Sequence, residues 1–68
     1  MKFSNAQLAE CAWREVRWRT RVYPNRIFTG RMTRAKAAIE IEMMETIAQH
    51  FQAMADTDQP ELFDNAEE

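Results

Sequence analysis

The sequence predicts an all-α protein: an αα-hairpin with a short connecting helical turn, which dimerises into a four-helix-bundle-like core and ends in a disordered acidic C-terminal tail. Two observations indicate the hairpin. Apolar residues recur at helical spacing in two long segments, residues 5–22 and 34–55. Between them lie Pro24 and the single glycine, Gly30, which favour a new helical turn and a helix end.

The first helix is expected from about Asn5 to Val22. Ser4 can cap its start, because the serine hydroxyl accepts from the backbone N–H of Gln7 while the Gln7 side chain reaches back. Tyr23 precedes a proline and is therefore disfavoured in the helical region, which predicts the end of the helix. Seven residues share one side of this helix and form its expected core face. They are Leu8, Ala9, Ala12, Trp13, Val16, Thr20 and Tyr23.

The connection is expected to contain one helical turn over residues 24–29. Pro24 suits the first position of such a turn, and Gly30 suits the left-handed residue just past its end. The turn would carry Ile27 and Phe28.

The second helix is expected from Arg34 to about Ala55, with Thr33 as its N-cap. Two apolar series run along it without a glycine or a proline. The first series is Ile39, Met43, Ile47 and Met54, and the second is Ala37, Ile41, Met44, Ala48, Phe51 and Ala55. Together the series cover more than half of the helix circumference, which is too wide for a single antiparallel neighbour. A second copy of the chain would cover the excess, and this predicts the homodimer.

Size and composition exclude several classes of protein. A chain of 68 residues is marginally stable alone. Its one cysteine, Cys11, excludes an internal disulfide, and one histidine, His50, is too few for a structural zinc cluster. Oligomerisation remains as the stabilising device. No apolar run approaches the ~20 residues of a membrane span, and no signal-peptide core follows the start. The expected protein is soluble and cytoplasmic, without metal or cofactor.

Charge divides the chain into two halves. The first 36 residues carry nine Lys/Arg and two Glu, for +7, whereas residues 37–68 carry nine acids and no Lys or Arg, for −9. Such polarity indicates that a basic element packs against an acidic one, or that each half faces a different partner.

Residues 56–68 are expected to form a flexible acidic tail behind a helical domain of residues 1–55. Gln59, Leu62 and Phe63 make a Gln-x-x-Leu-Phe arrangement in this tail. It resembles the peptide with which bacterial and phage DNA-processing proteins dock on the replicative sliding clamp, and it departs from that family at Pro60, where leucine is usual. The resemblance implies that the leucine and the aromatic ring fill an apolar pocket while the glutamine amide hydrogen-bonds. Alternatively, Leu62 and Phe63 fold back onto the helical body, or the match is accidental.

A second candidate surface, the arginine–tryptophan face, lies on the first helix. Its members Arg14, Arg17, Trp18 and Arg21 fall within about 100° of one another. Trp and Arg dominate protein-binding hot spots, and the same residues can stack on bases and meet phosphates. The structural alternative is that Trp18 packs under the connection or across the dimer, with the arginines around it. The acidic second half of the chain disfavours nucleic acid.

No constellation of residues indicates catalysis, so an enzyme is not expected. Glu40 lies within the apolar face of the second helix and Arg19 borders that of the first, so the hairpin should bring them together near Tyr23. The pair is expected to set helix register or dimer geometry. His50 is expected at the border of the core, and Cys11 has no neighbouring histidine to activate it.

The body of the chain is similar to small hypothetical proteins encoded by phages and prophages of proteobacteria. The similarity rests on residues 10–12, 21–24, 30–33 and 41–45. It implies that the protein is encoded by a phage or prophage, but it implies no catalytic or binding residues. With the tail it predicts a non-enzymatic phage-type adaptor that docks on the sliding clamp. The alternatives are a phage inhibitor that binds a host regulatory protein through the arginine–tryptophan face, and a nucleic-acid-binding protein.

Overall fold

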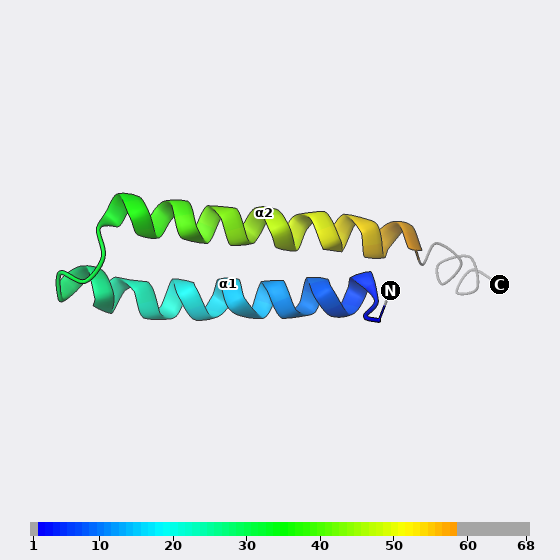
Figure 1. The fold of residues 1–68 in the computed structure, drawn as a ribbon, viewed down its shortest axis with the longest axis horizontal. Coiled ribbons are helices and arrows are strands. Elements are labelled where there is room, and N and C mark those ends of the chain that lie inside the picture. Colours follow the sequence, from blue (N-terminus) through cyan, green and yellow to red (C-terminus); the bar gives the residue numbers. More distant parts are fainter. Residues whose placement is uncertain (1, 59–68) are drawn as a thin grey trace, which may run out of the picture.

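The protein is an αα-hairpin of two long antiparallel helices. The computed structural model describes residues 2–58. In these, α1 spans Asn5–Phe28 and α2 spans Arg34–Asp58, with a short connection between them. The helices lie side by side along their lengths, and the end of α2 lies at the same end of the hairpin as the N-terminus (Figure 1). The predicted all-α hairpin is confirmed, and the dimer stays a prediction.

A capping box starts α1, as predicted. The Gln7 backbone N–H donates to the Ser4 hydroxyl oxygen at 3.0 Å, and the Ser4 backbone N–H donates to the Gln7 side-chain oxygen at 2.9 Å. Two N–H groups that the helix itself cannot satisfy are thereby paired.

The predicted end of the first helix at Val22 is wrong, because α1 continues through Pro24 to Phe28. The predicted short turn is therefore the last turn of α1 rather than a separate element. Tyr23 is buried, and we attribute the helical conformation of this residue before proline to its packing in the hairpin. Since Pro24 has no N–H, the helix gives up the bond that would reach the Thr20 carbonyl oxygen.

Gly30 ends α1, as its sequence position predicted. Its φ is +81°, a left-handed conformation that glycine adopts without the penalty other residues meet. The Gly30 N–H donates to the Ile27 carbonyl at 3.1 Å, and the Arg31 N–H donates to the Arg26 carbonyl at 2.9 Å. This paired arrangement is a Schellman motif, which satisfies carbonyls at the helix end and turns the chain toward α2.

Thr33 caps α2 as predicted, since its hydroxyl oxygen accepts from the Lys36 backbone N–H at 3.1 Å. The far end differs from the prediction: α2 continues three residues past Ala55, to Asp58. The helical body therefore extends to residue 58, and not to 55. Residues 56–58, which were predicted to belong to the acidic tail, form the end of α2. Residues 59–68 of the predicted tail lie outside the described residues.

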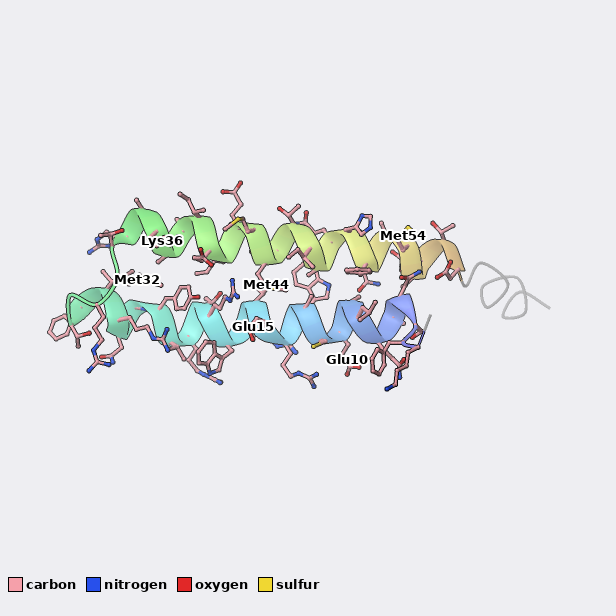
Figure 2. The ribbon with its side chains drawn as sticks, viewed as in Figure 1. Glu10, Glu15, Met32, Lys36, Met44 and Met54 are labelled. Carbon is pink, nitrogen blue, oxygen red and sulfur yellow. The ribbon has the colours of Figure 1, made fainter. Side chains whose placement is uncertain are left out.

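Small side chains hold the two helices together. The buried apolar residues are Ala9, Ala12, Val16, Tyr23, Ala37, Ala48 and Ala55. Ala48 is fully buried against Ala12 and Val16, with Trp13 and Met44 packed around them. Met44 reaches from α2 toward α1 (Figure 2). Alanine at the contact lets the helix backbones approach closely, which is why so few large residues are buried.

The two apolar series of α2 face different sides. Residues of the second series, among them Ala37, Ala48 and Ala55, are buried or half-buried against α1. The first series remains exposed, so one neighbouring helix does not cover both, as the sequence predicted. On α1, Thr20 was expected in the core face but is exposed. Its hydroxyl donates to the Val16 carbonyl at 2.9 Å, so its polar group is satisfied within its own helix.

Candidate functional site

The arginine–tryptophan face lies on the outer side of α1. Arg14, Arg17, Trp18 and Arg21 are all exposed, and Trp18 retains 39% of its accessible surface. At about 100° per residue, this face is opposite the stripe of α1 that packs on α2. The prediction that these residues share one solvent-facing surface is confirmed, and within the hairpin Trp18 is not a core residue.

Arg26 joins this face and was missed from the sequence. Its guanidinium carbon lies 5.4 Å from the centroid of the Trp18 ring and 5.8 Å from that of Tyr23, both within the range of a cation–π contact. The predicted helix end at Val22 places Arg26 outside the helix that carries Trp18. Arg26 follows Trp18 by eight residues, so in a continuous helix the two lie within about 80° of each other around the helix axis. The long arginine side chain spans the remaining distance.

The positive charge of this face is not neutralised within the helical body. Among residues 2–58, the ion pairs join Arg19 to Glu15 and Glu40, and Lys36 to Glu40. Arg14, Arg17 and Arg21 enter none of these pairs. An exposed tryptophan beside guanidiniums that pair with no acid of the helical body can bind an acidic surface that also offers an apolar contact.

A polar cluster between the helices centres on Arg19, and the predicted meeting of Arg19 with Glu40 is confirmed. The Arg19 Nη1 donates to the Glu40 backbone carbonyl at 2.8 Å and lies 3.6 Å from the Glu40 carboxylate. The Arg19 Nε donates to Glu15 at 3.0 Å. The hydrogen bond to Glu15 raises the pKa of the Arg19 guanidinium, against the lowering caused by burial, and the charges of Tyr23, Glu15 and Glu40 raise it further. The side chains of Arg19, Glu15 and Glu40 are all partly exposed. The cluster therefore lies at the edge of the helix contact, where it fixes the register of the two helices.

Cys11 and His50 belong to no metal-ligand cluster in the described part of the chain. Cys11 is exposed. His50, expected at the border of the core, is also exposed and packs edge-on against Phe51, with ring centroids 5.2 Å apart. Within the part of the chain that the structure describes, no three His, Cys, Asp or Glu side chains gather as metal ligands. Neither α1 nor α2 is long and apolar enough to cross a membrane.

The predicted docking residues Gln59, Leu62 and Phe63 lie outside the described residues. The helix that precedes them ends at Asp58, directly before Gln59. Comparison with protein-family models, with curated proteins and with solved structures finds no match for this chain.

Proposed function

We propose that this protein is a small non-enzymatic adaptor of phage type, which works in the bacterial cytoplasm and docks on the DNA polymerase sliding clamp through Gln59, Leu62 and Phe63. One observation carries the proposal: the Gln-x-x-Leu-Phe arrangement stands in an acidic segment that begins where the helical body ends. A leucine and a phenylalanine can fill a preformed apolar pocket, while the glutamine amide fixes the register of the peptide.

Two further features support a docking role for the tail. Among residues 2–58, the side chains that α1 and α2 bury against each other lie between positions 9 and 55, so the helical body has a contact of its own that precedes the motif in sequence. Pro60 restricts the unbound peptide, which lowers the conformational entropy lost on binding.

Calorimetric titration of a purified bacterial sliding clamp tests the proposal. We expect micromolar or tighter binding of the full-length protein. The double change Leu62→Ala/Phe63→Ala should abolish binding while circular dichroism reports unchanged helicity. Asn65→Ala alters the same tail outside the motif and should bind like the wild type. Retained affinity in the double variant would reject the proposal.

A second candidate function is inhibition of a host regulatory protein through the arginine–tryptophan face. The contact of Arg26 with Trp18 and the exposed Arg14, Arg17 and Arg21 favour it, since an acidic partner surface would complement them. The double charge reversal Arg14→Glu/Arg17→Glu separates the candidates. Inhibition through this face predicts that the variant loses its partner although its tail is intact, whereas clamp docking predicts unchanged affinity for the clamp. The same variant would also lose binding to nucleic acid, but that binding would weaken steeply with salt.

A further inference from the structure

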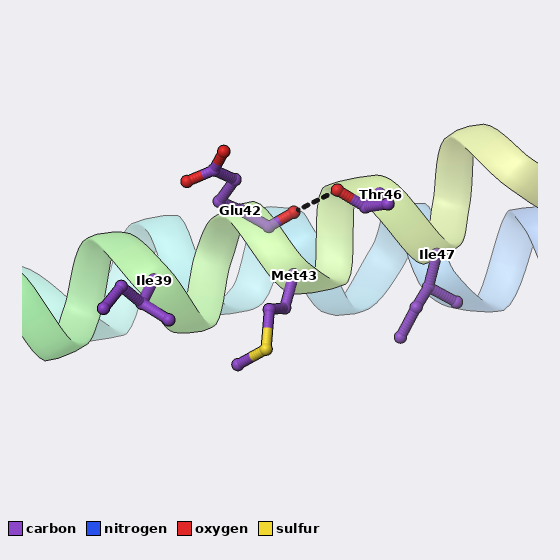
Figure 3. A pocket seen from close by; sticks show the side chains of 5 residues that line it. All are labelled: Ile39, Glu42, Met43, Thr46 and Ile47. Atoms are coloured by element: carbon purple, nitrogen blue, oxygen red, sulfur yellow. Dashed lines mark hydrogen bonds between the residues drawn. The ribbon is translucent and has the colours of Figure 1, made fainter.

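The side of α2 that α1 leaves uncovered carries four large apolar residues, here called the α2 stripe. Ile39, Met43, Ile47 and Met54 expose 52%, 49%, 44% and 43% of their surfaces. At about 100° per residue they fall within about 80° of one another. Figure 3 shows Ile39, Met43 and Ile47 projecting from the same side of the helix, where with Glu42 and Thr46 they line a shallow groove. The stripe is an apolar surface that α1 does not cover, and the exposed His50 side chain interrupts it between Ile47 and Met54.

The small core of the hairpin indicates what covers this stripe. Within residues 2–58, five of the seven buried apolar residues are alanine, and no large side chain is fully buried. A two-helix unit with so little buried surface is marginal alone, since helices gain most of their stability from tertiary packing. The hairpin therefore gains stability from any further apolar contact. A second copy of the chain can supply that contact along the whole stripe.

The charges at the two ends of α2 indicate how that copy is oriented. Arg34 and Lys36 lie in the first turn, whereas Asp56 and Asp58 lie in the last, and neither turn carries the opposite charge. This distribution opposes the helix dipole, which favours acids at the start and bases at the end. Antiparallel pairing of two such helices offsets this unfavourable interaction with the dipole, because the basic end of each helix then attracts the acidic end of the other copy.

Lys36 and Asp58 are suited to that role because both remain exposed. At about 100° per residue, each falls on the side of α2 that carries the stripe. Each makes one polar side-chain contact with the rest of the described hairpin. Lys36 lies 3.2 Å from the Glu40 carboxylate and keeps 63% of its side chain exposed. Asp58 accepts a hydrogen bond from the Asn5 side chain at 2.7 Å. Both charges are therefore available to a second copy.

We propose that the α2 stripe is a homodimer interface, in which two copies pack α2 against α2 in antiparallel orientation and cross near Ile47. The contact is isologous, so one surface serves both copies. Lys36 then lies close to Asp58 of the partner subunit at each end, and the two hairpins form one four-helix core. The dimer carries two tails, which raises the avidity for any target with more than one pocket.

Sedimentation equilibrium on the full chain tests the interface. We expect twice the chain mass of 8.1 kDa, and a melting temperature that rises with protein concentration. Met43→Asp should weaken the dimer by more than about tenfold, because it would bury an unpaired carboxylate. Ala38→Asp adds the same charge at an exposed position away from the stripe and should leave the dimer intact. A folded monomer at high micromolar concentration, or a dimer that is indifferent to Met43→Asp, would overturn the proposal.

Cysteine cross-linking with a short bismaleimide tests the orientation. In a Cys11→Ser background, Lys36→Cys and Asp58→Cys chains are prepared separately and then mixed. The antiparallel arrangement predicts cross-linked dimers in the mixture and none from either variant alone. Cross-linking of the Lys36→Cys chain to itself would instead reveal a parallel pair and reject the arrangement.

Discussion

Arg19 of α1 donates a hydrogen bond from Nη1 to the backbone carbonyl oxygen of Glu40 in α2, over 2.8 Å. A side chain that holds a backbone atom of the facing helix fixes how far one helix can slide along the other. Sliding by one helical turn, about 5.4 Å, would break the bond. The alanine-rich contact resists such sliding weakly, since small side chains interlock less than large ones, so the polar cluster of Arg19 supplies register.

Removal of the Arg19 side chain should destabilise the hairpin. Arg19→Ala loses the bonds to Glu15 and Glu40, and we expect the free energy of unfolding in urea to fall by about 1–2 kcal/mol. Arg19→Lys keeps the charge but lacks the planar fork that reaches both partners, so it should recover less than half of the loss. If Arg19→Ala proved as stable as the wild type, the cluster would have no role in register.

The cost of Arg19→Ala should not change between about pH 6 and 9, because arginine stays protonated there. The bond to Glu15 raises the pKa of Arg19 in the folded state. A raised pKa gives stability that is fully present below the unfolded-state pKa and is lost only as pH rises through the folded-state pKa. Urea titrations of the variant and the wild type at both pH values check this, and a cost that disappears by pH 9 would contradict it.

The capping box at Ser4 can be tested by a pair of substitutions. Ser4→Ala removes the acceptor for the Gln7 N–H and should lower the free energy of unfolding by about 1 kcal/mol. Ser4→Asp restores an acceptor and adds a negative charge at the helix start, so it should match or exceed the wild type. Thermal unfolding followed by circular dichroism measures both, and equal losses in the two variants would argue against a capping role.

Replacement of the proline inside α1 should stabilise the protein. Pro24→Ala restores a backbone N–H that can reach the Thr20 carbonyl, at a position that is already helical. Helix propensity favours alanine over proline by about 3 kcal/mol. The greater conformational freedom of the unfolded variant offsets up to about 1 kcal/mol of this gain. A net gain of about 2 kcal/mol in urea unfolding is therefore expected, and destabilisation would mean that the proline ring itself packs in the fold.

The close approach of the helices at Ala48 leaves no room for a larger side chain. Ala48 has 0% exposure, so Ala48→Leu should force the helices apart and cost about 1–3 kcal/mol. Ala38→Leu makes the same change at an exposed position of α2 and should be nearly neutral. Similar stability of the two variants in urea would show that the helix contact is looser than the structure describes.

Local chemistry made several features of this fold predictable. Ser4, Thr33 and Gly30 have hydrogen-bonding or backbone properties that suit the ends of helices, and each lies at such an end. The contact between Arg19 and Glu40 was predictable from the two apolar faces, because Arg19 borders the face of the first helix and Glu40 lies within that of the second. The outward position of Trp18 followed from the same periodicity.

The missed features depend on contacts between residues far apart in sequence. Burial of Tyr23 accompanies a helix that runs through Pro24, and that continuity brings Arg26 to Trp18. At the other end, α2 continues through residues 56–58, where Asp58 accepts a bond from Asn5 of α1 at 2.7 Å. Rules for proline and for acidic runs describe local preference alone, and tertiary contacts override them.

The measurement that tests the proposed function most directly is displacement of the full-length protein from the sliding clamp by a peptide of residues 56–68. Fluorescence anisotropy of labelled protein bound to the clamp would follow it. We predict complete displacement by the wild-type peptide and none by the Leu62→Ala/Phe63→Ala peptide. A full-length protein that does not bind the clamp, or that stays bound at saturating wild-type peptide, would contradict docking through Gln59, Leu62 and Phe63.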